Sequence, residues 1–398
     1  MLRLTEEMDT AIRAVAVVPP GLEEAAAAEL AELGGLAIKP LRRAVSLECD
    51  LATFYRLHLR ARLPFRILRQ LASFPCHSKD ALYEGIQAAV DWEHWLPPEC
   101  SFRVDASGSA PGLNHSHYSA LQVKNALVDW QRQRWGSRSS VDLDNPDLNL
   151  HLHLGGGLAS LSVDGSGASL HRRGYRERMG LAPLKENLAA GLIRLTGWDG
   201  SVPLADPLCG SGTLLIEAAA MALGRPPGLD GATGAAPRAL ALQRWNDFAP
   251  DLWQLELAAA QDAGRDALAD GQPLAAIVGC DVDDQVIDQA RANAEAAGVS
   301  RWLTLHRGDC RSFEPPAEPG VLVCNPPYGA RLGADDHEGL EQLYADLGAM
   351  AKERCGGWTL WLLSGNPELT GALRMKASRK VPVSNGGIDC RWLRYEIR

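Results

Sequence analysis

Residues 206–217 read Asp206-Pro-Leu-Cys-Gly-Ser-Gly-Thr-Leu-Leu-Ile-Glu217, a pattern that could bind a small charged ligand. Gly210 and Gly212 let the backbone turn sharply and leave space for a ligand beside it. Such a turn at a helix N-terminus presents amide N–H groups to a carboxylate or phosphate. Asp206 could accept a hydrogen bond from a ligand's ammonium group. The pattern also fits an ordinary tight turn, but it is not a P-loop, because no Gly-Lys-Ser/Thr follows.

Two further aspartates follow later strand-like segments. Asp281 ends Gly279-Cys-Asp281, where a carboxylate can accept hydrogen bonds from both ribose hydroxyls, as in dinucleotide-binding folds. Asp309 follows Gly308 and suits an adenine amino group. A single aspartate at a strand end more often caps a helix. Three on successive strands fit the rule that ligands bind at the carboxyl edge of a parallel sheet.

The motif Asn325-Pro-Pro-Tyr-Gly329 directly follows the apolar run Val321-Leu-Val-Cys324. Consecutive prolines fix φ and lack N–H donors, which leaves backbone carbonyls free to accept hydrogen bonds. Asn325 adds a side-chain acceptor, and Tyr328 offers a flat ring for stacking. The motif therefore favours an amine on a planar ring, since two acceptors would aim the nitrogen lone pair at an electrophile. The alternative is a rigid loop with a buried tyrosine.

The elements that must position these residues form a repeating pattern. Short apolar runs at 202–206, 275–282, 303–309 and 321–327 alternate with helical stretches, which predicts a parallel sheet covered on both faces. Residues 225–270 lack a clear strand and are expected to form a helical insertion, which would explain why Asp281 lies further along than the usual ~20 residues. Asn385-Gly386-Gly387 predicts a hairpin near the end of the chain.

The N-terminal half of the sequence shows a different pattern, in which strand-like segments alternate with short helical segments. Strict alternation over Leu148–Leu154 predicts a strand. Ser78 is a candidate N-cap for the helix that follows it.

Charge is distributed unevenly over the 398 residues. The net charge of −9 argues against a general nucleic-acid binder. However, Ile38–Arg138 holds fourteen basic and nine acidic residues, and Leu170–Arg194 holds six and two. These stretches could contact a phosphate backbone, or they could form a solvated surface of mixed charge.

The cysteines and the apolar segments exclude further classes of protein. The nine cysteines are scattered without a Cys-x-x-Cys pair, so we expect neither a disulfide framework nor a metal site. We find no uncharged apolar stretch of about 18 residues and no secretory signal. We therefore expect no membrane association and a cytoplasmic location.

Together the motifs resemble class I S-adenosylmethionine-dependent methyltransferases of the amino-methylating branch, over roughly residues 165–398. The segments His171–Arg176, Ala182–Leu188 and Asn385–Arg391 are more specifically similar to the bacterial 23S rRNA guanine-N2 methyltransferases, which carry an N-terminal THUMP RNA-binding domain. Lys124–Asp129 and the following residues up to the predicted strand resemble the end of a THUMP domain.

The resemblance implies an α/β protein. Residues 161–398 would form a Rossmann-like class I methyltransferase domain, with the insertion at 225–270 and a parallel sheet that ends in an antiparallel hairpin. An α+β region would precede it, with a ferredoxin-like part over 1–50 and a THUMP RNA-binding domain over 51–160. Some relatives are fused to a second methyltransferase. Only one is recognised here, so we expect none of the fused form's additional roles.

The resemblance also implies a cofactor, a partner and site residues. S-adenosyl-L-methionine would donate a methyl group to the exocyclic N2 of a guanine in RNA, either 23S rRNA or a ribosomal precursor. The residues that match the cofactor site are Asp206, Cys209, Gly210, Ser211, Gly212, Thr213, Asp281, Asp309 and Asn325. Those that match the catalytic site are Asn325, Pro326, Pro327 and Tyr328. The segment Lys185–Asn187 would close over the methionine end of the cofactor. Candidate RNA contacts in the basic stretches are Arg60, Arg62, Lys124, Arg172, Arg173 and Arg176.

Four alternatives remain open. The substrate could be a guanine in tRNA, or the chain could methylate the N6 amine of adenine in DNA. The same motif could hold a glutamine side chain of a protein, although the basic front half would then have no role. Finally, the chain could be a non-catalytic RNA-binding assembly factor whose cofactor pocket only stabilises the fold.

Overall fold

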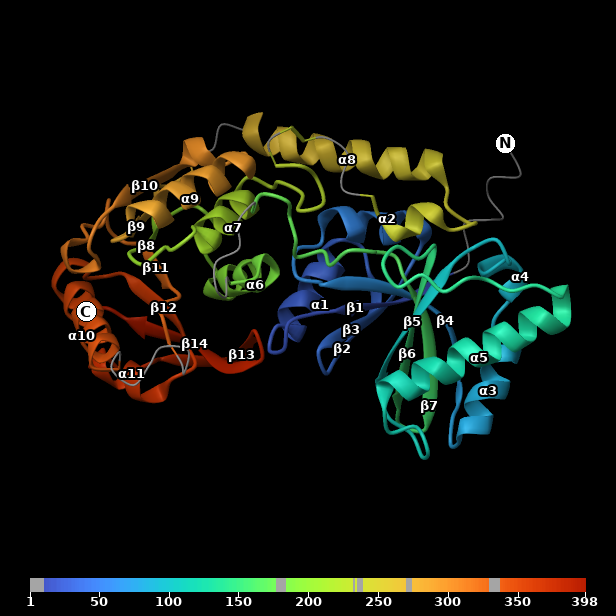
Figure 1. The fold of residues 1–398 in the computed structure, drawn as a ribbon. Coiled ribbons are helices and arrows are strands. Elements are labelled where there is room, and N and C mark those ends of the chain that lie inside the picture. The colour runs from blue at the N-terminus through green and yellow to red at the C-terminus, as the bar shows by residue number, and fades with distance from the viewer. Residues whose placement is uncertain (1–10, 177–183, 232, 235–238, 270–273, 329–336) are drawn as a thin grey trace.

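Two seven-stranded sheets form the protein, one from each half of the chain (Figure 1). The computed structural model describes residues 11–176, 184–231, 233–234, 239–269, 274–328 and 337–398. Within these ranges no helix is long and apolar enough to cross a lipid bilayer.

The N-terminal sheet has the strand order β2-β3-β1-β4-β7-β6-β5. The long strand β4 joins its two halves, because it pairs antiparallel with β1 on one side and with β7 on the other. The predicted strand near residue 148 is confirmed as β6, whose side chains alternate between buried and more exposed positions. The strands are β1 (Ile12–Val17), β2 (Leu36–Leu41), β3 (Ala44–Cys49), β4 (Arg66–Pro75), β5 (Phe102–Gly108), β6 (Leu148–Gly155) and β7 (Leu158–Asp164).

Within residues 11–164, which the structure describes, this half of the chain forms five helices. The predicted N-cap is confirmed, because the Ser78 hydroxyl accepts a hydrogen bond from the backbone N–H of Ala81 at 3.1 Å. The Asp50 carboxylate caps α2 in the same way, accepting from the Thr53 N–H at 2.7 Å. The helices are α1 (Glu23–Glu32), α2 (Leu51–Arg60), α3 (Lys79–Ala88), α4 (Trp92–Trp95) and α5 (Ser116–Trp135).

The C-terminal sheet has the strand order β10-β9-β8-β11-β12-β14-β13. The first five strands are parallel and the last two are antiparallel, which confirms the predicted Rossmann-like sheet with a terminal hairpin. The strands are β8 (Leu204–Asp206), β9 (Ile277–Asp281), β10 (Leu303–Arg307), β11 (Val321–Cys324), β12 (Thr359–Ser364), β13 (Arg379–Asn385) and β14 (Ile388–Glu396).

Helices accompany this second sheet, as the alternating pattern predicts. They are α6 (Glu186–Thr196), α7 (Thr213–Ala222), α9 (Asp284–Ala296), α10 (His337–Arg354) and α11 (Pro367–Ala372), with short 3-10 helices at Ala241–Arg244, Ser300–Trp302 and Cys310–Ser312.

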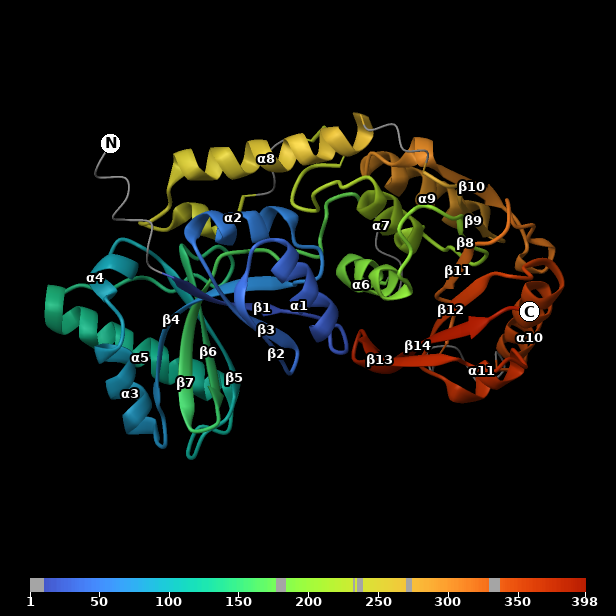
Figure 2. The ribbon, with the colours of Figure 1, turned by 180° about the vertical axis from the view of Figure 1, so that it is seen from behind.

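One long helix, α8 (Pro250–Ala269), runs along the side of the molecule and spans the C-terminal and N-terminal halves (Figures 1 and 2). It packs against α2, where the Arg56 guanidinium donates to both carboxylate oxygens of Glu256 at 2.7 and 3.0 Å. The backbone N–H of Ala249 donates to the Tyr55 hydroxyl at 2.9 Å just before the helix begins. The segment between β8 and β9 therefore helps to fix the relative position of the two sheets.

The N-terminal half also docks directly on the edge strand β13. The backbone N–H of Ser384 donates to the Pro20 carbonyl at 3.2 Å. Gly21 has a φ of +89°, and a Cβ added there would lie 2.0 Å from the Pro382 carbonyl oxygen. Only glycine fits this contact, because both the backbone conformation and the space exclude a side chain.

We predict that Gly21→Ala lowers the apparent Tm, because the new Cβ would force the N-terminal half away from β13. Gly112→Ala is the matched control, since Gly112 has a similar φ of +77° but nothing within 4 Å of an added Cβ. Both variants carry backbone strain of about 1–3 kcal/mol, so the difference between them isolates the steric contact. Equal Tm values for the two variants in a calorimetric scan would contradict this account.

Candidate functional site

The predicted site residues gather at the carboxyl edge of the parallel sheet. Asp206 ends β8 and pairs in register with Gly279, two residues before Asp281 at the end of β9. β11 pairs with β8 on its other side, so Asn325 follows its last residue at the same edge. The parallel direction of the strands brings these side chains together although they are far apart in the chain.

The glycine turn after β8 is tied to the neighbouring strand. The Cys209 N–H donates to the Cys280 carbonyl at 2.9 Å, and the Gly210 N–H donates to Oδ2 of Asp281 at 3.0 Å. Gly210 and Gly212 have φ values of +52° and +79°, as their predicted role requires. Nothing lies within 4 Å of a Cβ added at Gly210, so the space beside the turn is open to a ligand.

The other predicted residues of the turn, Cys209, Ser211 and Thr213, lie just before α7 and at its first position. Cys209 is buried, and burial raises the pKa of its thiol, which therefore stays neutral. The Ser211 carbonyl accepts from Nδ2 of Asn293 at 3.1 Å. Thr213 is the first residue of α7, and its hydroxyl accepts from the Arg176 guanidinium at 2.5 Å. These contacts hold the turn at the start of α7.

Asp206 is an acid whose protonation a ligand could control. Its side chain is 2% exposed, and Oδ1 accepts from the Leu208 N–H at 3.0 Å. Burial raises the pKa of Asp206 to about 8, and the neighbouring charge of Asp281 contributes in the same direction. The carboxyl group is therefore largely protonated at pH 7, and a cationic ligand beside it would favour the ionised form.

Asp309 lies after β10 but is already engaged by a neighbour. Its carboxylate accepts from Nε of Arg311 at 3.0 Å for each oxygen, and from the Arg311 backbone N–H at 2.9 Å. These hydrogen bonds lower the pKa of Asp309 to about 2. The Arg311 side chain is 66% exposed, so it is free to move aside for an adenine amino group.

Asn325 provides an unsatisfied acceptor. Its Oδ1 is buried and has no hydrogen-bond partner among the described residues. A buried acceptor without a donor costs about 1–3 kcal/mol, so its retention indicates that a donor from outside completes the site. Pro326 is buried next to it, whereas Pro327 is exposed and its carbonyl accepts from the Tyr344 hydroxyl at 3.4 Å.

Tyr328 is fixed by a residue that sequence reasoning assigned only to a turn. Nδ2 of Asn385, at the end of β13, donates to the Tyr328 hydroxyl at 2.8 Å. The Cys390 thiol lies 3.4 Å from the same oxygen, and a Cβ added at Gly365 would come within 3.1 Å of the ring. Burial raises the pKa of Tyr328, so its hydroxyl stays protonated. The spacing of the motifs contains no signal for this contact, because it depends on how the hairpin folds back.

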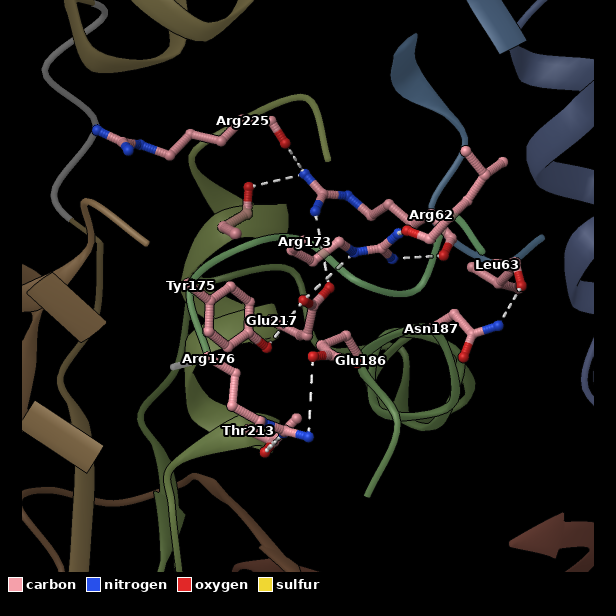
Figure 3. A network of polar contacts seen from close by, with 12 residues as sticks. Arg62, Leu63, Arg173, Tyr175, Arg176, Glu186, Asn187, Thr213, Glu217 and Arg225 are labelled. Carbon is pink, nitrogen blue, oxygen red and sulfur yellow. Dashed lines mark hydrogen bonds and ion pairs between the residues drawn. The ribbon is translucent and has the colours of Figure 1, made fainter. Parts of the chain in front are cut away.

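Three of the arginines predicted to contact RNA lie inside the protein instead (Figure 3). The side chains of Arg62, Arg173 and Arg176 are 11%, 5% and 7% exposed. The Glu217 carboxylate, 2% exposed, lies 3.9 Å from Nη1 of Arg62 and 3.6 Å from Nε of Arg173. These buried ion pairs leave the three guanidinium groups no surface for a phosphate backbone, which corrects that part of the prediction.

The same network reaches the glycine turn. Nη1 of Arg176 lies 3.8 Å from the Glu186 carboxylate in α6, while its Nη2 donates to Thr213 in α7 (Figure 3). The three other candidate RNA contacts keep some exposure. Arg60 and Lys124 are half-buried on α2 and α5, and Arg172 is exposed.

No group of three or more residues that could hold a metal ion occurs in the part of the chain that the structure describes.

Comparisons with known proteins agree with this architecture. Residues 173–394 match the family described as "RMKL-like, methyltransferase domain". Residues 76–164 match the THUMP domain, and residues 13–68 match the RlmL ferredoxin-like domain. A Synechocystis sp. protein named as a candidate RNA methyltransferase is 42% identical over 385 residues, which cover 96% of each chain. The chain belongs to the RMKL-like methyltransferase family.

Other relatives of this RMKL-like methyltransferase are longer. Ribosomal RNA large subunit methyltransferase K/L of Ectopseudomonas mendocina is 38% identical over 392 residues, and that of Pseudomonas paraeruginosa is 39% identical over 390. The alignments cover 96% and 95% of this chain but only 52% of each relative, so the chain spans about half the length of these proteins.

Solved structures support the cofactor. SMU.472, solved in complex with SAH, has a TM-score of 0.84 and 28% identity, with 98% of this chain and 99% of that chain covered. A Listeria monocytogenes protein described as a predicted N6-adenine-specific DNA methylase has a TM-score of 0.84 and 29% identity, with 98% and 97% covered. SAH is what S-adenosylmethionine becomes after it has lost its methyl group. In this RMKL-like methyltransferase, the turn at Gly210 is open beside two strand-end carboxylates, which is the space that the predicted cofactor would need.

We predict that Glu217→Gln lowers the free energy of unfolding by about 3 kcal/mol, because two buried arginines would lose their counter-charge. Glutamine keeps an acceptor for the Tyr175 hydroxyl, which lies 3.2 Å from Oε1, so the variant removes mainly charge. Asp288→Asn is the control, since that side chain is 74% exposed in its pair with Arg291. If denaturant unfolding gives similar losses for both variants, the network is not a source of stability.

We predict that the contributions of Asp206 and Asp309 to stability change with pH in different ways. Between pH 4 and pH 8 folded Asp206 keeps a proton that the unfolded chain has released, so this group stabilises less as pH rises. The Tm of Asp206→Asn minus that of the wild type should therefore increase from pH 5 to pH 8. Asp309 has a lowered pKa, so its contribution is lost only as pH falls below about 4. The same difference for Asp309→Asn should be flat from pH 5 to pH 8. A flat profile for both would refute the assignment for Asp206.

Proposed function

We propose that this chain transfers the methyl group of S-adenosylmethionine to the exocyclic N2 of a guanine in RNA, with 23S rRNA as the substrate. The observation that carries the proposal is the buried, unpartnered Oδ1 of Asn325 at the strand edge, beside a stretch of backbone that has no N–H donors. An aromatic amine supplies the donor that this acceptor lacks. The THUMP match and the names of the relatives support RNA as the carrier of that amine.

The chain's own residues would orient the amine. Oδ1 of Asn325 and the carbonyl of Pro326 are the proposed acceptors of its two N–H bonds, since the Pro327 carbonyl already accepts from Tyr344. Two acceptors turn the nitrogen lone pair toward the methyl group. Tyr328 would stack on the base, which is worth about 1–3 kcal/mol. Asn385 is a positioning residue, because it holds the Tyr328 hydroxyl.

Bound S-adenosylmethionine supplies a methyl group on a sulfonium, which is already activated. As the new N–C bond forms, the S–C bond breaks, and the amine then releases its extra proton to solvent. No strong base is needed, so the site acts mainly through orientation, which can supply about 7–11 kcal/mol of barrier reduction. A guanine stacked in a helix could not reach Asn325, so the target base must be unpaired or flipped out.

We further propose a division at residues 1–50, 51–160 and 161–398 into ferredoxin-like, THUMP and methyltransferase parts. The pairing of β4 with both β1 and β7 supports a single RNA-binding unit formed by the first two parts. The adenine N6 amine fits Asn325 equally well, and the Listeria monocytogenes structure makes it the second candidate. The THUMP match favours RNA over DNA.

The test is to incubate the protein with methyl-labelled S-adenosylmethionine and, separately, 23S rRNA, tRNA and DNA, and then digest each to nucleosides. We expect label in N2-methylguanosine from 23S rRNA. In the same assay, Asn325→Ala should lower turnover by about 10²-fold or more. The affinity for S-adenosylhomocysteine, measured by calorimetry, should change by less than threefold.

Asn246→Ala, at an exposed residue before α8, is the control for asparagine loss and should keep full turnover. Label in N6-methyladenosine, or in no nucleic acid, would refute the proposed function. Equal losses of turnover and S-adenosylhomocysteine affinity in Asn325→Ala would show that Asn325 is structural.

A further inference from the structure

A groove of about 590 Å³ separates the N-terminal half from the catalytic sheet. Its walls come from five places in the chain: the loop before α1, the loop between β2 and β3, Phe65 before β4, the start of α6, and the β13–β14 hairpin. The lining residues that matter here are Arg42, Arg43, Phe65, Lys185, Gly386 and Gly387. The groove is separate from the cavity lined by Arg62, Arg173 and Glu217.

The groove opens beside the proposed target-amine site. Ser364, the last residue of β12, pairs with Arg391 of β14. The hairpin continues past this point to the pair Asn385–Ile388, so its turn projects beyond the carboxyl edge of the sheet. Asn385 contacts Tyr328, while its neighbours Ser384 and Gly386 line the groove. One turn thus touches both the proposed stacking ring and the groove. In Figure 1 β13 lies on the side of the C-terminal sheet that faces the N-terminal half.

The groove is lined by three cations, Arg42, Arg43 and Lys185, and by two acids, Glu23 and Asp389, so its net charge favours an anion. Arg42, Arg43 and Lys185 are exposed, and among the described residues none of them forms an ion pair. The Lys185 ammonium lies 4.9 Å from the centre of the Phe65 ring, which holds it over the groove wall. Glu23 also lines the groove, but its two carboxylate oxygens accept from the backbone N–H groups of Arg43 and Gly21 at 2.9 and 2.8 Å. That acid is therefore committed to the backbone rather than to the guanidinium groups.

We propose that this groove binds the phosphate backbone of the RNA strand on one side of the target base, with Arg42, Arg43 and Lys185 as the phosphate-binding residues. The proposal rests on the proposed function for the identity of the ligand. Guanidinium groups bind phosphate oxygens in a bidentate manner, and such contacts set the register of a nucleic acid on a protein. A flipped base needs its flanking backbone held, and this groove is the positively charged surface that continues from Tyr328.

The assignment also accounts for the placement of the basic residues. The arginines at 62, 173 and 176 are buried in ion pairs and bind Glu217 and Glu186. Lys185, adjacent to Glu186, and the Arg42–Arg43 pair remain at the surface. These three exposed cations line one groove and form no ion pair among the described residues, whereas a polyanion would neutralise all three.

The test compares Arg42→Ala/Arg43→Ala and Lys185→Ala with the wild type in equilibrium binding to 23S rRNA fragments from 50 to 200 mM salt. We expect each variant to bind RNA about tenfold or more weakly at low salt, and the three substitutions together to reduce the salt slope by about 2. The Tm should stay unchanged in each variant, and Arg42→Ala/Arg43→Ala should keep its affinity for S-adenosylhomocysteine. Lys376→Ala is the matched control, since it removes an exposed lysine that precedes β13, at the end of that strand remote from the groove.

The outcomes separate this inference from the proposed function. If the wild type methylates RNA but the variants keep its RNA affinity and salt slope, the groove assignment is overturned and the proposed function stands. If the variants weaken RNA binding while the wild type methylates no RNA, the groove assignment stands and the proposed function fails. If Lys185→Ala instead weakens S-adenosylhomocysteine binding alone, Lys185 belongs to the cofactor site. If Lys376→Ala weakens RNA binding as much as these variants do, RNA affinity depends only on the net charge of the protein, and the groove assignment is overturned.

Discussion

A buried carboxylate lies at the junction of the two halves of this methyltransferase. Glu217 on α7 lies between Arg62, which precedes β4 of the N-terminal sheet, and Arg173, which follows β7. Two cations and one anion removed from water are stable only as a set, because any one of them alone would carry the full cost of desolvation. Since α7 also begins at the glycine turn, the placement of the N-terminal half and the geometry of the cofactor site depend on the same group.

The catalytic edge shows the opposite situation, a polar group deliberately left without a partner. Most buried acceptors in a folded protein are satisfied, yet Oδ1 of Asn325 is not satisfied by any described residue. The surrounding prolines supply no N–H, and Tyr328 is occupied by Asn385. An acceptor without a partner beside a flat ring is the arrangement on which the proposed binding of an aromatic amine rests.

Much of this could be predicted from local sequence. The strands, the turn glycines with positive φ and the hairpin at Gly386–Gly387 follow from residue type and periodicity. The gathering of Asp206, Asp281 and Asn325 at one edge follows from strand direction alone. The contact between Asn385 and Tyr328 could not be predicted, and neither could the engagement of Asp309 by Arg311, because spacing does not specify side-chain partners.

The sequence by itself determined the elements, the order of the chemical motifs and the family resemblance, because these depend on backbone preferences and on residues close together in the chain. Only the tertiary structure decided which cations face solvent. Arg173 and Arg172 are adjacent, yet one is buried against Glu217 and the other is exposed. Burial depends on what the rest of the chain packs against a side chain, and a linear pattern of charge carries no information about that packing.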